Sequence, residues 1–251
     1  AGVAGGSGKN DGVRLMSCQI FSGGKSAADA ATARAVKYAA DNGACIIQCS
    51  YGYSNASGGS NMTTDKRFKE FSPLLVEALE YFYKSKNCEA LDGGIAIYAA
   101  GNDGKLVSSY PGAYSKNISV TAIGPDGLPA AYTNYGPGCN IAAPGGEVSG
   151  FSGGAKAGIL STVCSELPDT QDTDYAFLQG TSMACPHVSG VAALGLSYAL
   201  KIGKKFTRDE YIAMMLTSVN DIESAFEGTK QTQGKINLEN YKYGKMGTGL
   251  I

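Results

Sequence analysis

Charge of either sign is scarce in this sequence, and it is almost balanced. Only 17% of the residues are Asp, Glu, Lys or Arg, and the formal net charge is -1 at pH 7. Such a chain lacks the basic surface that binds nucleic acid or an anionic membrane. It also has no apolar run near the roughly 20 residues that a membrane span needs, and its first residues do not resemble a signal peptide. We therefore expect no nucleic-acid partner and no membrane span.

Histidine is the scarcest residue that carries chemistry, because His187 is the only one in the chain. A serine hydrolase normally uses a histidine as its general base. His187 follows Ser182 by five positions, so on a helix the two side chains point about 140° apart. We therefore predict that His187 is a packed structural residue and that this chain does not hold a complete Ser-His-Asp triad.

Cysteine is present but follows no recognisable framework. The count is seven, so at least one thiol has no partner within the chain, and the spacing matches no zinc motif. Cys45 and Cys49 flank an apolar segment, where free cysteine acts as a small hydrophobe. The cysteines do not decide the compartment. They stand at positions 18, 45, 49, 88, 139, 164 and 185.

What the chain does have is enough apolar sequence for a sizeable core. It contains 251 residues, of which 43% are hydrophobic and 35 are glycine. Residues 13–21 predict a buried strand, and an alanine-rich helix follows, with a capping box at Ser26 and a stop at Asn42-Gly43. Residues 44–50 predict the next strand. This β-α-β order predicts parallel strands joined by a right-handed crossover.

Later segments extend the same pattern. A helix is predicted from Ser72-Pro73, and another is predicted from a capping box at Thr207 and Glu210. Further strands are predicted at 95–100, 118–123 and 138–142, with a hairpin around 159–164. We predict one α/β domain over residues 1–251, with a mostly parallel twisted sheet and helices on both faces.

The most distinctive stretch runs from Gln179 to Gly190. Thr181 and Ser182 are natural helix-start residues, and the segment after Pro186 is small and apolar on nearly all sides. Ser182 is therefore predicted at the positive end of a buried helix, where developing negative charge is favoured. Taken alone, a serine at this place is usually only a helix cap.

The string Gly180-Thr181-Ser182-Met183-Ala184-Cys185-Pro186-His187-Val188 resembles the nucleophile motif of the subtilisin-like serine proteases, the subtilases. Ser182 takes the place of the nucleophile. Ala99-Ala100-Gly101-Asn102 resembles the family's oxyanion motif, which implies that Asn102 and the Ser182 N–H stabilise the oxyanion. Outside this resemblance, an asparagine after glycine at a strand end is usually a turn residue.

Two further segments resemble the substrate-binding parts of the family. Ser50-Tyr51-Gly52 is similar to the segment that pairs with an extended peptide, and together with Ala99-Ala100-Gly101 it would form the walls of a specificity pocket. Ser109-Tyr110-Pro111-Gly112 resembles the segment at the floor of that pocket, and its Tyr-Pro bond is a candidate cis peptide. No carboxylate stands in the pocket walls, although Asp103 could lie at the rim. This favours apolar or broad cleavage specificity.

The resemblance also implies what this chain does not contain. In subtilases the catalytic Asp and His precede the point at which this sequence begins. We therefore expect an incomplete subtilisin-like domain without its N-terminal part. A companion fragment would carry the Asp and the His. The isolated chain, with an uncovered sheet edge, is expected to be poorly soluble.

The function implied is a serine endopeptidase that hydrolyses polypeptides through an acyl-enzyme on Ser182. No cofactor is required for this chemistry. Structural calcium is a family property for which the sequence names no ligands, and the family implies a secreted or extracytoplasmic location. The alternative is a non-catalytic scaffold that binds extended peptides at Ser50–Gly52. A thiol nucleophile at Cys185 is disfavoured because no histidine faces it. An unrelated α/β hydrolase is disfavoured because Ser182 lacks a Gly-x-Ser-x-Gly elbow.

Overall fold

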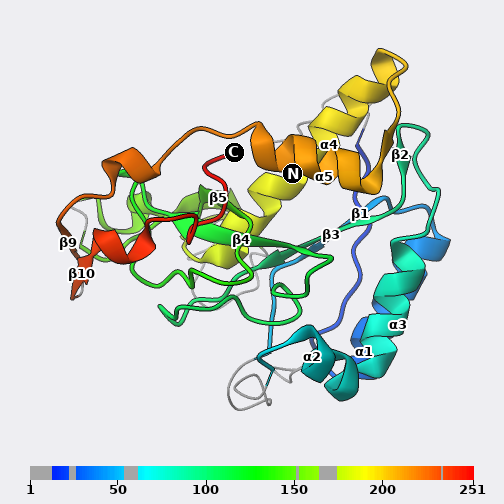
Figure 1. Ribbon diagram of the computed structural model, residues 1–251, viewed down its shortest axis with the longest axis horizontal. Coiled ribbons are helices and arrows are strands. Elements are labelled where there is room, and N and C mark those ends of the chain that lie inside the picture. The colour runs from blue at the N-terminus through cyan, green and yellow to red at the C-terminus, as the bar shows by residue number, and fades with distance from the viewer. Residues whose placement is uncertain (1–12, 23–26, 54–61, 151–152, 164–173, 233) are drawn as a thin grey trace.

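A computed structural model describes residues 13–22, 27–53, 62–150, 153–163, 174–232 and 234–251 (Figure 1). At its centre is a parallel four-stranded sheet. The strand order is β1 (Ile46–Cys49), β3 (Ile95–Ala99), β4 (Ile118–Ile123) and β5 (Ile141–Pro144). Every residue of β3 and β4 is buried, as expected of strands that are covered on both faces. The predicted parallel sheet is confirmed, although its last strand starts at Ile141 rather than at residue 138.

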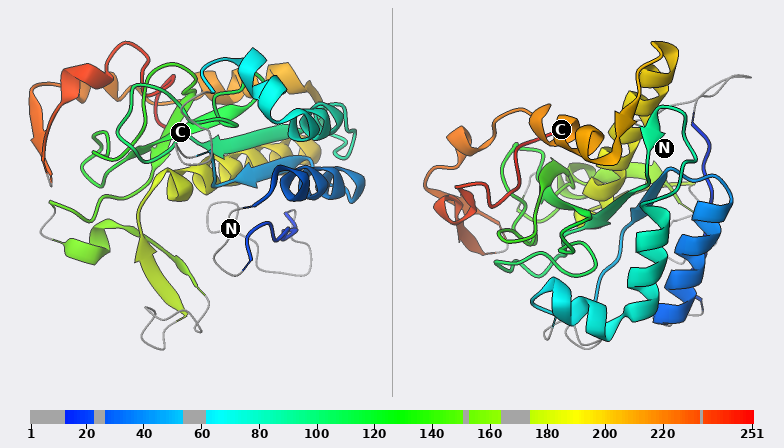
Figure 2. Two further views of the ribbon diagram at one scale, coloured as in Figure 1. Left: turned by 90° about the horizontal axis from the view of Figure 1, so that it is seen from below. Right: turned by 45° about the vertical axis from the view of Figure 1, so that its right-hand side comes forward.

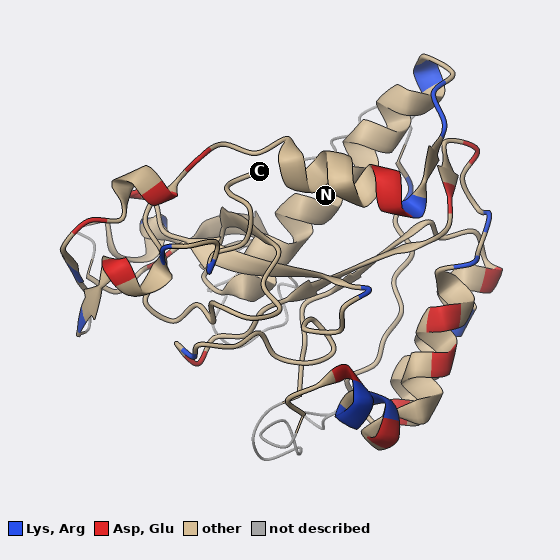
Figure 3. Cartoon of the chain, viewed as in Figure 1, with Lys and Arg blue, Asp and Glu red and all other residues tan. Residues whose placement is uncertain are grey.

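Helices cover both faces of this sheet, as predicted. On one face, α4 (Thr181–Lys201) and α5 (Arg208–Thr217) enclose a core with the aliphatic side chains of β3, β4 and β5. On the other face, α1 (Asp29–Asp41) and α3 (Pro73–Phe82) pack over Ile47, Ala96 and Tyr98. Figure 2 shows these layers from two further directions. The central strands carry no charged residue, and charges gather on the outer helices and loops (Figure 3).

The long helix α4 is largely apolar and packs against the sheet. Ala184, Cys185, Val188 and Ala192 are fully buried, and these small side chains let the helix lie close to the strands. By length and composition, α4 is apolar enough to cross a membrane, so the expectation that no such segment exists is wrong at this helix. In this structure its buried side chains, such as Val188 and Leu196, are part of the core against the sheet.

The first predicted strand is not present. Residues 13–21 form no strand, and Leu15 and Phe21 are 79% and 50% exposed. A strand needs a partner for its backbone N–H and C=O groups, and no described strand pairs with this segment. The β-α-β unit predicted here is therefore wrong within the described residues. Its helix α1 has Ala28 as N-cap rather than Ser26, which is outside the described residues, and it ends at Asn42 as predicted.

The other predicted helices are close to their expected positions. Helix α3 starts after Ser72 with Pro73 in its first turn, but Leu74 is 55% exposed instead of facing the core. Helix α5 has the predicted capping box between Thr207 and Glu210. Helix α2 (Asp65–Phe71) was not predicted, and its only buried residue is Phe68.

The remaining elements are short and surround the sheet. The predicted hairpin consists of β6 (Ile159–Thr162) and β7 (Tyr175–Leu178), which project from the body of the molecule (Figure 2). Near the C-terminus, Leu250 lies beside Ala142, so the last residues cover the outer edge of β5. The other short elements are β2 (Leu91–Asp92), β8 (Phe206–Thr207), β9 (Thr229–Gln231), β10 (Lys235–Asn237) and 3₁₀ turns at Gly154–Ala157, Glu223–Ala225 and Leu238–Tyr241.

The capping box of α5 gives a direct test of this fold. The Thr207 hydroxyl accepts a hydrogen bond from the Glu210 N–H, one of the donors that a helix start leaves unpaired. We expect Thr207→Ala to lower the free energy of unfolding by about 1 kcal/mol. Urea denaturation measures this change. Thr217→Ala, at the exposed opposite end of the same helix, is the control and should stay within about 0.5 kcal/mol of the parent.

Candidate active site

The carboxyl ends of β1 and β3 meet the start of α4 at one edge of the sheet. Ser50 follows β1, Asn102 lies just beyond β3, and Ser182 is the second residue of α4. The Ser182 hydroxyl donates to the Ser50 carbonyl at 3.3 Å, and the Thr181 N–H donates to Asn102 Oδ1 at 2.8 Å. The structure therefore brings together the three segments that the resemblance linked.

Pro186 explains how Ser50 and Ser182 are joined. It lies inside α4, beyond the first turn of the helix, and it has no N–H to donate to the carbonyl of Ser182 four residues earlier. The Ser50 hydroxyl donates to that carbonyl instead, at 2.7 Å. Gln48 Nε2 in turn lies 2.6 Å from Ser50 Oγ. The missing helical hydrogen bond thus ties the end of β1 to the residue that carries the candidate nucleophile.

The Asn102 side chain is held in one orientation by Thr181. The Gly101 N–H donates to Thr181 Oγ1 at 3.2 Å, so this hydroxyl donates onward to Asn102 Oδ1 at 2.9 Å. The Thr181 N–H donates to the same oxygen. A backbone N–H can only donate, so the oxygen of the Asn102 amide must face Thr181. The Nδ2 group, which has two hydrogens to donate, is turned the other way.

Gly180 leaves a small space in front of these donors. Its φ is +146°, and a Cβ built there would lie 3.4 Å from Asn102 Nδ2 and 3.5 Å from the Ser182 nitrogen. The Ser182 N–H belongs to the first turn of α4, where N–H groups have no partner within the helix. The Asn102 and Ser182 nitrogens therefore lie around one point at the positive end of α4, the kind of position at which donors can hold an oxyanion.

The predicted pocket segments are in contact with one another. The Ser109 N–H donates to the Ala100 carbonyl at 2.8 Å, and the Tyr53 N–H donates to the Tyr110 carbonyl at 2.9 Å. A Cβ on Gly52 would lie 3.3 Å from Ser109 Cβ, so Gly52 and Ser109 are close neighbours. The peptide bond between Tyr110 and Pro111 is cis, as proposed from the sequence. Asp103 is exposed outside these walls.

Asn134 holds these walls together, and sequence reasoning missed it. It is 1% exposed, and its Nδ2 donates to the Ala100 carbonyl at 3.0 Å and to Ser109 Oγ at 3.3 Å. Its Oδ1 accepts from the N–H groups of Asp103 and Lys105. A buried amide with both ends satisfied rigidifies its surroundings. No motif or period in the sequence marks this residue.

The single histidine does not serve the candidate nucleophile. His187 is half-buried, and its Nδ1 lies 2.8 Å from the Met183 carbonyl, to which it donates. This agrees with the predicted structural role. Within the described residues, the Ser182 hydroxyl bonds to the Ser50 carbonyl and to no imidazole.

Cys185 is placed as a core residue rather than as a nucleophile. Its thiol is fully buried and donates to the Ile97 carbonyl at 3.4 Å. Burial raises the pKa of this thiol to about 12, which leaves it protonated at neutral pH. Over the described part of the chain, no three His, Cys, Asp or Glu side chains gather as metal ligands. The structural calcium implied by the resemblance stays a prediction.

Comparison with known proteins agrees with this geometry. The family model of the Subtilase family matches residues 1–244. The chain belongs to the subtilase family. Thermitase from Thermoactinomyces vulgaris is 29% identical over 180 residues, which cover 72% of this chain and 50% of thermitase. Halolysin from Haloferax mediterranei is 43% identical over 103 residues, and the extracellular basic protease of Dichelobacter nodosus is 39% identical over 119 residues.

Those two matches cover 41% and 47% of this subtilase, but only 17% and 18% of the relatives. The chain thus spans half or less of the length of the three relatives. Among solved structures, a lanthipeptide protease has a TM-score of 0.68 at 21% identity. The match covers 93% of this chain and 66% of the lanthipeptide protease. The prenylagaramide maturation protease PagA has a TM-score of 0.57 at 24% identity, covering 90% and 65%. These likenesses confirm the subtilisin-like α/β fold.

The burial of Cys185 has a measurable consequence. At pH 8 a thiol of pKa about 12 has a thiolate fraction roughly 10³-fold below that of an exposed cysteine, and the thiolate is the reactive form. We expect iodoacetamide to spare Cys185 in the folded protein at pH 8 and to modify it in urea, as mapped by mass spectrometry. Equal labelling of Cys185 in both conditions would contradict this picture of the site.

Proposed function

We propose that this chain supplies the nucleophile and the oxyanion donors of a serine endopeptidase. The observation that supports this most strongly is the convergence of Asn102 Nδ2 and the Ser182 N–H on the space in front of Gly180. Catalysis depends on donors that are already aimed where charge develops in the transition state. A merely structural asparagine would have no need of donors left open beside a serine hydroxyl.

The proposed reaction forms an acyl-enzyme. Ser182 Oγ attacks the carbonyl carbon of the scissile peptide bond, and the carbonyl oxygen becomes an oxyanion held by the two donors. The leaving amine takes the proton that came from Ser182, by way of the general base. Water then hydrolyses the ester and restores Ser182.

The proposed substrate is an extended polypeptide. Its backbone would pair with the segments Ser50–Gly52 and Ala99–Gly101, which end at the same edge of the sheet. The side chain before the scissile bond would enter the space above Ser109. Because these walls carry no charged side chain, we propose a preference for apolar residues over basic ones there.

We further propose that the general base and its orienting Asp come from an N-terminal segment outside this sequence. The only imidazole in the chain, His187, donates to the Met183 carbonyl and cannot take the Ser182 proton. A chain that carries the nucleophile and the oxyanion donors still lacks the general base and the Asp that orients it. The histidine of the N-terminal segment would have to lie within hydrogen-bond distance of the Ser182 hydroxyl.

Two surfaces of the described chain suit such a segment. On α4, Leu194 and Tyr198 are 51% and 61% exposed, and with Val191 and Ile202 they form an apolar stripe at helical spacing. On the sheet, β1 pairs with β3 on one side, and no described strand pairs with its other edge. A helix on the stripe and a strand on the β1 edge would bury both surfaces.

The location of the enzyme is also a proposal. The Dichelobacter nodosus relative is named an extracellular protease. We propose that this subtilase likewise acts outside the cytoplasm. The chemistry proposed above uses no cofactor, and structural calcium remains a proposal taken from the family resemblance.

A fluorophosphonate probe tests the proposed function. Such probes react with a serine only when a base activates it, so we expect Ser182 to be labelled in the polypeptide that includes the N-terminal segment. The 251-residue chain alone should stay unlabelled, as should the Ser182→Ala variant of the longer protein. Equal labelling of the short chain would mean that the base lies within it. A folded longer protein with no label would contradict the protease assignment.

Asn102 gives a second, quantitative test in the same active protein. We expect Asn102→Ala to lower kcat by about 10²–10³-fold with little change in KM, because its amide acts on charge that develops in the transition state. That magnitude is the one known for the corresponding donor of a subtilisin. Asn240→Ala, at an exposed asparagine near the C-terminus, is the control and should leave kcat unchanged. A rise in KM alone would assign Asn102 to substrate binding.

A further inference from the structure

Two cysteines meet at the end of the sheet opposite the candidate active site. Cys45 directly precedes β1, and Cys88 lies in the turn before β2. Both side chains are partly buried, and both pack against the same core as α4. Ser50 lies at the other end of β1, five positions from Cys45 and roughly 16 Å away in an extended strand. The cysteine pair is therefore separate from the catalytic groups.

The backbone around this pair is closely tied. Asn87 Nδ2 donates to the Ala44 carbonyl at 2.9 Å and to the Ala40 carbonyl at 2.6 Å, so the residue before Cys88 is bonded to the residue before Cys45. On the other side, the Ile95 N–H donates to the Cys45 carbonyl at 3.0 Å. The two cysteines are thus held together by the segments on which they stand.

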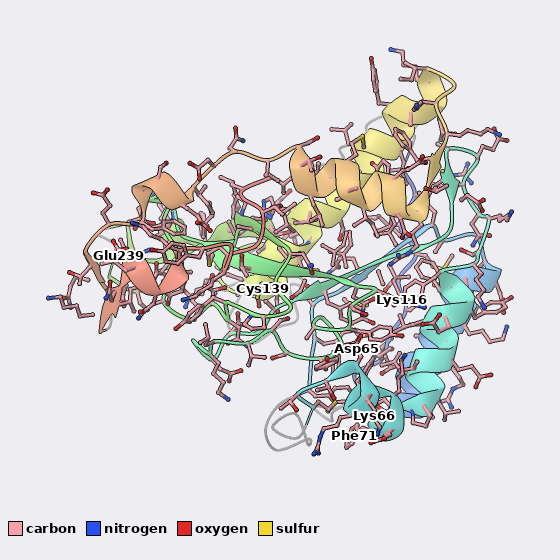
Figure 4. The ribbon with its side chains drawn as sticks, in the orientation of Figure 1. Asp65, Lys66, Phe71, Lys116, Cys139 and Glu239 are labelled. Atoms are coloured by element: carbon pink, nitrogen blue, oxygen red, sulfur yellow. The ribbon has the colours of Figure 1, made fainter. Side chains whose placement is uncertain are left out.

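The thiols also interact with each other. Burial and the neighbouring Cys88 thiol together raise the pKa of the Cys45 thiol to about 11. Cys139 provides a contrast, because its side-chain neighbour is the Ser108 hydroxyl. Cys139 is labelled in Figure 4, in the part of the chain near the central sheet.

We propose that Cys45 and Cys88 are a covalent modification site, oxidised to a disulfide by a small-molecule disulfide as the protein folds. One cysteine thiolate attacks the oxidant's sulfur–sulfur bond, forms a mixed disulfide and releases one small thiol. The second cysteine attacks the protein sulfur of this mixed disulfide and releases the second small thiol. The two cysteines lose two electrons and two protons in total, and the two small thiols carry both away.

The bond would form during folding rather than afterwards. A thiol whose pKa is about 11 holds little thiolate at neutral pH, so in the folded protein the pair reacts slowly with an external oxidant. The unfolded chain exposes both thiols with ordinary pKa values. Once closed, the bond would tie the α1–β1 connection to the α3–β2 connection, and the ring would enclose α2 and α3. It would stabilise the fold by restricting the unfolded chain.

Peptide mapping tests the proposal directly. The full chain is refolded with reduced and oxidised glutathione, free thiols are alkylated in urea, and the unreduced digest is examined by mass spectrometry. We expect a cross-linked peptide pair that joins Cys45 to Cys88 and is lighter by two hydrogens, with Cys139 recovered in its alkylated form. Recovery of Cys45 and Cys88 as alkylated thiols, or joined to other cysteines, would overturn the proposal.

A thermal measurement gives an independent test. We expect reduction of the refolded protein to lower Tm by about 4–15 °C, the range that a disulfide of ordinary effect gives in a chain of this size. Cys139→Ser, the matched control, should keep this shift, whereas Cys88→Ser should lose it. An equal shift in Cys88→Ser would assign the effect to another bond and overturn the proposal. If Cys88→Ser does not fold, the peptide map of the parent protein decides.

Discussion

The packing of α4 along the parallel sheet is the constraint on which the site depends. Small side chains at Ala184, Cys185 and Ala192 bring the helix close to the strands, so its first turn meets the strands' carboxyl ends. Pro186 then removes one helical hydrogen bond, and the freed Ser182 carbonyl accepts from Ser50 instead. A local defect in the helix thus becomes the link between the nucleophile and the peptide-binding segment.

The same close packing determines the direction of the donors. Thr181, the first residue of α4, is buried, and it relays a hydrogen bond from the Gly101 N–H to Asn102 Oδ1. Because the amide oxygen is occupied by Thr181, the amide hydrogens are turned toward the space beside Ser182. Gly180 keeps that space open, since a Cβ there would occupy it, in van der Waals contact with both nitrogens. Preorganisation of this kind avoids the cost of reorienting dipoles when charge develops.

The sequence predicted those features whose cause is local. Strands β3 and β4 were found because their residues are mostly apolar, and α5 was found because Thr207 and Glu210 form a capping box. The motif around Ser182 pointed to the subtilase family, to which the chain belongs. Features that depend on distant partners were missed. Residues 13–21 have the composition of a strand but no described strand to pair with.

Asn134 and α2 show two other limits of sequence reasoning. Asn134 holds the pocket walls together because its side chain bonds to Ala100, Ser109 and two backbone N–H groups. The residues next to it in the sequence give no indication of these contacts. Helix α2 is too short to show a helical period of apolar residues, and it buries only one side chain, so its sequence does not indicate a helix. In both cases the information lies in the tertiary contacts, which one sequence without its relatives does not display.

The proposed division of the catalytic groups has an energetic consequence. The apolar stripe lies on α4, whose first turn contains Ser182. The unpaired edge belongs to β1, and Ser50 is the residue that follows this strand. A segment that covered these surfaces would gain stability from buried apolar area and from strand pairing. If the same segment carries the histidine, the free energy that seats it also positions the base beside Ser182. Assembly and activation would then be one event, and the oxyanion donors, already in place in this chain, would need no further rearrangement.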